Sequence, residues 1–172
     1  RGVVLALLEK AELHGFSPPE EREPWLHEAL ALATANGWRF ETLRAWIRLA
    51  ECSKKRGETR EALHTLRVEC LPLATGEGEA AFVRHRMGEL LELRGERAEA
   101  LRELRAARDE FARLNARKLL AQAELDIAEI DMAESRLDDA RRALKERVLP
   151  AFDALGDLHG RATALKQLAR ID

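Results

Sequence analysis

The chain has 172 residues, which is enough for one globular domain or one short helical solenoid. Charged residues make up 35% of the sequence, yet the formal net charge is only −2, which excludes the strongly basic composition typical of nucleic-acid-binding proteins. No apolar run approaches the ~20 residues that a membrane-spanning helix needs. Tyrosine is absent and Val, Ile and Thr are sparse, which argues against a sheet. We therefore expect an all-α protein with neither a membrane nor a nucleic acid as its partner.

The spacing of apolar residues and the positions of Gly and Pro predict nine helices along the chain. In chain order they cover residues 2–14, 22–35, 39–56, 58–74, 78–94, 96–114, 117–134, 137–155 and 158–171. The first two are separated by a segment with three prolines, residues 16–24, which we interpret as an insertion into the first repeat. Pro72 and Pro150 fall late in two predicted helices. We expect them to kink or end these helices, because proline removes a backbone donor and clashes with the preceding turn.

An internal repeat of 38 to 41 residues connects these helices. In each copy a large apolar residue precedes a small one, at Leu49-Ala50, Met87-Gly88, Ile127-Ala128 and Leu168-Ala169. A turn then follows, and Gly57 and Gly95 suit the left-handed conformation that ends a helix. Each turn leads to a second small residue: Ala62, Ala100 and Ala140. Helices joined this tightly are antiparallel, and one hairpin cannot bury its apolar face alone, so we expect the pairs to stack into a solenoid.

These residues resemble the tetratricopeptide repeat (TPR) family, whose pattern of about 34 residues contains a Trp, a Leu-Gly pair, a Gly before the turn and an Ala after it. Trp46, Leu49-Ala50, Gly57 and Ala62 stand at those offsets. With the longer period, the pattern formed by Leu149-Pro150, Leu155-Gly156-Asp157 and Ala162 resembles a bacterial long-repeat subtype that occurs in large signalling proteins. The resemblance implies a right-handed α-solenoid of antiparallel helix pairs, about nine helices in all, forming one domain over residues 1–172.

The sequence shows no arrangement typical of an active site or a metal site. It contains five histidines, at His14, His27, His64, His85 and His159. None stands at zinc-binding spacing, and we interpret them as surface residues. There is no glycine-rich phosphate loop and no nucleophile elbow. Cys52 and Cys70 are expected to be unpaired thiols, which suits the cytoplasm. We therefore expect no catalysis, no cofactor and no bound metal.

In the TPR family the first helix of each pair lines a concave surface, and the resemblance implies the same surface here. Counted by offset, its positions in three repeats are Arg44, Ile47, Glu51, Lys54, Phe82, His85, Glu89, Glu92, Gln122, Leu125, Glu129 and Met132, with Thr163, Lys166 and Arg170 in a partial fourth. Glu51, Glu89 and Glu129 share one offset, and Glu9 falls in phase with them. Carboxylates stacked in a concave wall attract cations, which predicts a groove for a basic segment of a partner. The alternative is ordinary surface charge, with each carboxylate paired to an Arg or Lys of a neighbouring helix.

We therefore expect a non-catalytic protein–protein interaction scaffold that binds a partner segment in its concave groove. The chain begins with Arg1 and shows no clear capping elements, which indicates the repeat arm of a larger bacterial signalling or regulatory protein, with uncapped ends that allow self-association. The alternative for the C-terminal end is that residues 157–172 form a capping helix. One alternative is a ligand- or peptide-sensing domain that switches an attached ATPase, transcription-factor or protease domain, which an apolar pocket would favour. Another is RNA binding through the arginines of residues 96–114, although acidic residues interleave with them.

Overall fold

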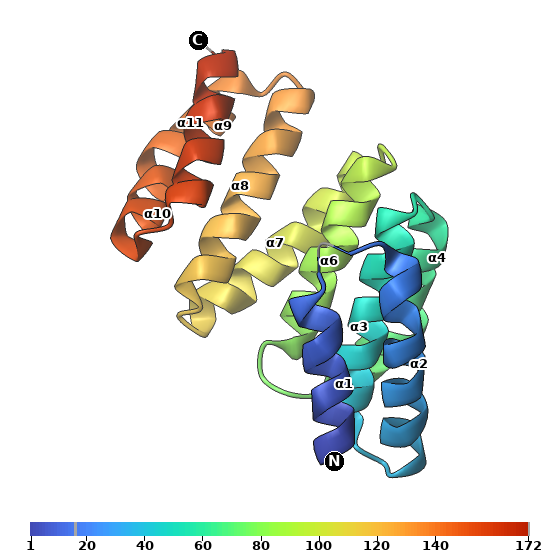
Figure 1. The fold of residues 1–172 in the computed structure, drawn as a ribbon. Helices are drawn as coiled ribbons and strands as arrows, with labels where there is room; N and C mark the ends of the chain where they lie inside the picture. Colours follow the sequence, from blue (N-terminus) through green and yellow to red (C-terminus); the bar gives the residue numbers. More distant parts are fainter. Residues whose placement is uncertain (16, 172) are drawn as a thin grey trace. The chain divides into compact units, whose positions relative to one another are not determined.

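The computed structural model describes residues 1–15 and 17–171, and its regular structure is helical throughout (Figure 1). In chain order the elements are α1 (Gly2–Leu13), α2 (Pro19–Ala35), α3 (Arg39–Lys55), α4 (Thr59–Thr65), η1 (Leu66–Cys70), α5 (Leu71–Leu73), α6 (Glu79–Leu93), α7 (Arg97–Arg113), α8 (Arg117–Ala133), α9 (Leu137–Ala143), η2 (Leu144–Val148), α10 (Leu149–Leu155) and α11 (Leu158–Ile171). Elements α4, η1 and α5 follow one another without a break, as do α9, η2 and α10. The described residues therefore form nine helical rods, as predicted. None of these helices is long and apolar enough to cross a membrane.

The segment predicted as a proline-rich insertion is largely helical. Helix α2 begins at Pro19 rather than at residue 22, and Pro24 lies inside it. Proline is tolerated at the first helical position, because the N–H there would have no partner within the helix. The connection between α1 and α2 is therefore shorter than predicted. Phe16, the first residue of the predicted insertion, and Asp172, the last of the predicted domain, lie outside the described residues.

The chain divides into two compact units, Arg1–Gly76 and Glu77–Asp172. In the first unit α1, α2, α3 and the α4–α5 rod pack in succession, and neighbouring helices run antiparallel (Figure 1). The buried core of this unit consists of Val4, Leu8, Ala11, Leu26, Ala29, Ala33, Ala45, Leu49 and Cys52. Trp25, Trp38 and Trp46 pack against this core and stay half-buried. Cys52 and Cys70 are both unpaired, as predicted.

In the second unit α6 packs on α7, α7 on α8, and α8 on both the α9–α10 rod and α11. The small residues permit close approach between these helices. A β-carbon at Gly88 would lie 2.5 Å from Cγ of Leu104 in α7, and one at Gly160 would lie 2.5 Å from the ring of Phe152 in α10. Leu104 and Phe152 are themselves buried, so these two glycines set how closely the helices pack.

Six of the turns between helices share one backbone form. Their left-handed residues are Gly37, Gly57, Gly95, Asn115, Ser135 and Gly156. In each turn the next N–H donates to the carbonyl five residues back, as Glu58 does to Ser53, which is the Schellman pattern of a helix end. The predicted roles of the glycines at 57 and 95 are confirmed. Asn115 and Ser135 reach the same conformation, with φ of 53° and 62°, without glycine.

Pro72 and Pro150 each stand two residues beyond a π-helical turn, η1 or η2. In both turns the N–H of the residue before the proline, Leu71 or Leu149, donates to the carbonyl five residues back instead of four. The wider turn accommodates a residue that has no N–H and that would clash with a regular α-helical turn. The helix ends at Leu73 after the first proline but continues to Leu155 after the second. The predicted ending therefore occurs at Pro72, and at Pro150 the helix adapts.

Candidate functional site

In the second unit the first helices of successive pairs, α6, α8 and α11, are joined by polar side chains. His85 of α6 lies 2.7 Å from Asp126 of α8, measured from Nε2 to Oδ2. Gln167 of α11 donates from Nε2 to Oε1 of Glu129 in α8 at 2.5 Å. These three helices form the candidate site, which we call the α6–α8–α11 face.

A cavity of about 300 Å³ opens on this face. It is lined by Glu92, Glu129, Met132, Ala133, Leu137, Gln167 and Arg170. Four of these seven residues are charged or carry an amide, and two of the three charged ones are glutamates. Arg170 donates from Nη1 to Oε1 of Gln167 at 2.7 Å, so the amide of Gln167 bridges the guanidinium and the carboxylate of Glu129. The lining is therefore polar, with a net negative formal charge.

The surroundings of Glu129 on this face shift its pKa. Burial raises the pKa of Glu129 above its ordinary value, and the neighbouring carboxylates of Asp126 and Glu92 raise it further. The hydrogen bond from Gln167 and the charge of Arg170 act in the opposite direction but do not cancel the rise. Burial and neighbouring negative charges raise the pKa because they destabilise the ionised carboxylate. A cation that approaches the carboxylate stabilises this ionised form.

His85 is buried, with 2% of its surface exposed, so its interpretation as a surface residue was wrong. Phe111 of α7 meets the imidazole edge to face, with ring centroids 6.1 Å apart. The carboxylate of Asp126 contacts Nε2 of His85 and also accepts a hydrogen bond from Gln122 at 2.9 Å. The other four histidines are exposed, as predicted.

One group of side chains in the described residues has the composition and spacing of a metal site. Potential ligand atoms of His85, Glu89 and Asp126 lie within 4.8 Å of one another. The sequence did not predict it, because the three residues follow no known ligand spacing. Two come from one turn of α6 and the third from α8.

The first unit places the predicted residues of α3 in a balanced network of ion pairs. Arg44 and Arg48 both donate to Oε1 of Glu12 in α1, at 2.9 and 2.8 Å, and Arg48 also binds Glu51 at 2.8 Å. Burial alone would raise the pKa of Glu12, but the hydrogen bonds and charges of the two arginines lower it below its ordinary value. Two arginines thus face two carboxylates. Lys54, near the end of the same helix, is half-buried.

The three glutamates of the predicted acidic column have different neighbours. Arg48 binds Glu51, and Arg86 binds Glu89 at 3.0 Å, in each case from three residues earlier on the same helix. The alternative of paired surface charge therefore describes both, although the partner is on the same helix and not on a neighbouring one. Glu129 differs from the other two glutamates. The residue three positions before it is Asp126, so a second carboxylate stands where Glu51 and Glu89 have an arginine.

Three of the predicted contact residues are buried. Ile47 is 9% exposed, and His85 and Leu125 are each 2% exposed. Leu125 belongs to a core cluster of the second unit, so it presents no surface to a partner. Phe82 is half-buried, with the Arg86 guanidinium 5.0 Å from the centre of its ring. Phe82 and Met132 are the half-buried apolar members of the predicted set, and its other half-buried members are polar.

Two polar residues of the site, Asp126 and Gln167, were not predicted. Asp126 occupies the repeat offset of Arg48 and Arg86, so an alignment of the repeats that included this position would have found it. Gln167 occupies the same offset, directly before Leu168 as Asp126 stands directly before Ile127, so the same alignment would have found it.

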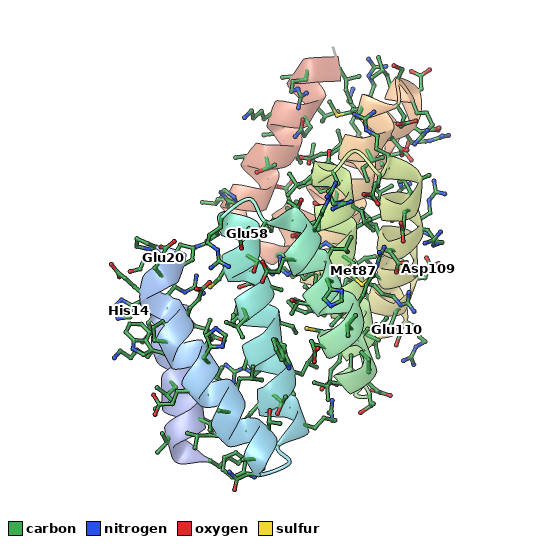
Figure 2. All side chains as sticks on the ribbon, turned by 90° about the vertical axis from the view of Figure 1, so that its right-hand side faces the viewer. His14, Glu20, Glu58, Met87, Asp109 and Glu110 are labelled. Carbon is green, nitrogen blue, oxygen red and sulfur yellow. The ribbon has the colours of Figure 1, made fainter. Side chains whose placement is uncertain are left out.

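The arginines of α7 do not form a basic stripe. Figure 2 shows Asp109 and Glu110 among the side chains of this helix. The ion pairs along it are Arg102–Glu99 at 3.0 Å, Arg108–Asp109 at 2.7 Å and Arg113–Glu110 at 2.6 Å. These contacts neutralise the charges on which RNA binding would depend.

Comparison with solved structures shows the fold. The chain matches a protein of Podosopora anserina described as a kinesin light chain with nearly identical TPR-like repeats, at 15% identity and a TM-score of 0.69, over 98% of this chain and 93% of that one. It matches a Rap protein complexed with Competence and Sporulation Factor at 17% identity and a TM-score of 0.78, over 96% of this chain and 52% of the Rap chain. It also matches BtubC (BKLC) from P. vanneervenii at 16% identity and a TM-score of 0.70, over 98% of this chain and 80% of that one. No protein-family model matches the sequence, and no curated protein matches it.

The chain therefore has the fold of a TPR-like helical repeat protein. It spans about half the length of the Rap protein that it matches.

Proposed function

We propose that the chain is a non-catalytic interaction module that binds a segment of a partner protein on the α6–α8–α11 face. In this proposal a Lys or Arg side chain of the segment enters the cavity. One observation carries it: Glu92 and Glu129 line the cavity, and the pKa of Glu129 is raised by burial and by its carboxylate neighbours. A cation placed beside Glu129 relieves this repulsion, and its attraction is stronger there than in open solvent.

The rest of the lining suits a long basic side chain. Met132 and Leu137 offer apolar surface for the methylene stem, which Lys and Arg bury while their charged ends stay near polar groups. Arg170, bound to Gln167, leaves the lining with two negative charges and one positive. We therefore propose that the cavity accepts one basic residue and disfavours a second one beside it.

The alternative of a ligand-sensing domain was expected to show an apolar pocket. The cavity has four polar or charged residues among its seven, which favours a charged protein segment over an apolar ligand. For the setting of this module we propose the repeat arm of a larger bacterial signalling or regulatory protein, of the long-repeat TPR subtype, in the cytoplasm. The TPR-like fold and the likeness to the Rap protein support this setting.

The test is a peptide-array binding assay with the whole chain, in buffer that contains a metal chelator. The array presents peptides with randomised flanks and one fixed residue: Lys, Arg, Glu or norleucine. We expect Lys and Arg peptides to be retained, and we expect Glu129→Gln to weaken their binding about tenfold, or roughly 1.4 kcal/mol.

Glu51→Gln is the matched control, because Glu51 has the same repeat offset but is bound by Arg48. We expect this variant to bind like the unaltered chain. Equal retention of acidic and basic peptides, or equal losses in the two variants, would contradict the proposed site. If no peptide is retained and a small molecule raises the melting temperature in a Glu129-dependent way, ligand sensing becomes the better explanation.

A further inference from the structure

His85 combines burial with an unsatisfied ring atom. Its side chain is 3% exposed, and within the described residues its Nδ1 atom has no hydrogen-bond partner. Oε1 of Glu89 lies 3.8 Å from Nδ1, which is too long for a hydrogen bond. Leaving a buried polar atom unsatisfied is unfavourable for folding, so this arrangement needs an explanation.

The tautomer of the ring follows from its other contact. Oδ2 of Asp126 lies 2.7 Å from Nε2 of His85, and an ionised carboxylate only accepts hydrogen bonds. In the neutral ring Nε2 therefore carries the proton, and Nδ1 presents a lone pair on the side of Glu89. A neutral imidazole with a carboxylate behind its opposite N–H is the usual arrangement of a metal-binding histidine.

We propose that His85 and Glu89 bind a divalent transition-metal ion between Nδ1 and Oε1, with Asp126 as the residue that positions the imidazole. His85 and Glu89 are four residues apart, which places them on the same side of α6. Metal–ligand distances of about 2.0–2.2 Å to nitrogen and carboxylate oxygen fit between two atoms that are 3.8 Å apart. Imidazole and carboxylate favour ions such as Zn²⁺, Co²⁺ or Ni²⁺ over Ca²⁺ and Mg²⁺. Water completes the coordination.

The side chains around Nδ1 of His85 and Oε1 of Glu89 determine how an ion reaches the proposed site and which charges it meets there. The side chains of Glu89 and Asp126 are 19% and 18% exposed, so the route from solvent passes their carboxylates. Arg86 donates from Nη1 to Oε1 and Oε2 of Glu89 at 3.0 and 3.3 Å, and it therefore competes with the ion for Oε1. The bound ion takes Oε1 and leaves Oε2 to Arg86. Removing the charge of Arg86 should consequently strengthen metal binding.

The test is isothermal titration of the chelator-treated whole chain with zinc sulfate, repeated with cobalt(II) chloride and followed by the visible absorption of the cobalt ion. We expect one ion per chain. Glu89→Gln and Asp126→Asn keep the shape of each side chain and should each weaken binding at least about tenfold, whereas Arg86→Gln should tighten it. Long-range ¹H–¹⁵N spectra of the histidine rings should show a zinc-dependent shift at Nδ1 of His85, with the proton kept on Nε2.

Glu51→Gln is the matched control, because Glu51 has the repeat offset of Glu89. Ile47, four residues before Glu51 on α3, stands at the offset of His85 and has no metal-binding atom. The metal affinity of the Glu51→Gln variant should equal that of the unaltered chain. Circular dichroism checks that each variant is folded. The proposal is overturned if no ion binds, if a folded Glu89→Gln or Asp126→Asn variant keeps full affinity, if Arg86→Gln weakens binding, or if the shifted resonance belongs to Nε2 or to another histidine. The peptide test is run in chelator, so the outcomes of the two tests are separate.

Discussion

Two glutamates at the same repeat position, Glu51 in the first unit and Glu129 in the second, have opposite electrostatic surroundings. In the first unit Glu51 is bound by Arg48, which also helps to lower the pKa of Glu12. In the second unit Asp126 stands where the arginine would be, and the pKa of Glu129 is raised. The repeat register therefore decides where a side chain lies, whereas the residue one turn earlier decides whether a cation or a second carboxylate stands beside it.

The largest expected effect concerns the close contact between paired helices, where the first unit has Ala50 and the second has Gly88. A methyl group at Gly88 would lie 2.5 Å from Cγ of buried Leu104, so α7 would have to move. We expect Gly88→Ala to lower the free energy of unfolding by about 2 kcal/mol, because overpacking outweighs the ~1 kcal/mol gained in helix propensity. Chemical denaturation measures this change in the free energy of unfolding.

The matched control is Ala50→Gly, which we expect to cost about 1 kcal/mol or less through lost helix propensity. A stabilised Gly88→Ala variant would show that α6 and α7 pack less tightly than the structure indicates.

The second prediction transfers the pattern of the first unit to the second. Asp126→Arg removes a carboxylate beside Glu129 and adds a cation, so the pKa of Glu129 should fall and basic peptides should bind about tenfold more weakly, or roughly 1.4 kcal/mol. Carbon-13 NMR titration of the side-chain carboxyls and the peptide assay measure the two effects. The reciprocal change, Arg48→Asp, should raise the pKa of Glu12. An unchanged Glu129 titration in Asp126→Arg would mean that Asp126 does not contribute to the raised pKa of Glu129.

The third prediction is an opposite response of the two units to acid. The pKa of Glu129 is raised above 4.5, so the native state binds its proton more tightly and stability is lost as the pH rises from 4.5 through the raised pKa. The pKa of Glu12 is lowered below 4.5, so its stabilisation is present above 4.5 and is lost as the pH falls through the lowered pKa. Denaturation as a function of pH tests both.

In these experiments Glu129→Gln should remove the loss of stability above pH 4.5, and Glu12→Gln should remove part of the loss below it. Parallel curves for the unaltered chain and for Glu129→Gln between pH 4.5 and 7 would refute the assignment to Glu129.

The smallest effect should come from an exposed ion pair. Arg102 pairs with Glu99 at 3.0 Å, and its side chain is 68% exposed. Such pairs contribute little because water screens them, so Arg102→Gln should change the free energy of unfolding by less than about 0.5 kcal/mol. Arg48→Gln should lower the free energy of unfolding by more, about 1 kcal/mol. Arg48 forms ion pairs with two carboxylates, and its side chain is only 31% exposed. Thermal denaturation measures the stability of both variants. A larger loss of stability in Arg102→Gln than in Arg48→Gln would contradict the prediction.

Most of the fold could be predicted from the sequence because its signals are local. Gly57 and Gly95 mark turns through a backbone conformation that few other residues adopt, and Ala62 and Ala100 mark the helices that follow. Asn115 and Ser135 form the same turn without that signal. The start of α2 was missed because residues 16–24 were interpreted as an insertion between helices, although Pro19 is tolerated at a helix start.

The site was less predictable because it depends on contacts between helices. An offset count placed His85 on the right helix, but its burial comes from Phe111 and Asp126 on two other helices. The pairing of Glu51 and Glu89 was within reach of the sequence, since Arg48 and Arg86 each stand three residues earlier. What a single sequence lacks is the orientation of each helix about its axis, which decides whether Leu125 lies in the core or on the surface.

The six Schellman turns have a consequence for how the protein is made. Each is closed by a hydrogen bond across five residues, so the two helices that it joins need no distant part of the chain in order to meet. Chains rich in local contacts fold fast, and synthesis delivers them to solvent from the N-terminus. A hairpin of this chain can therefore form while the ribosome is still translating the next one, and each completed pair offers a surface on which the following pair is assembled.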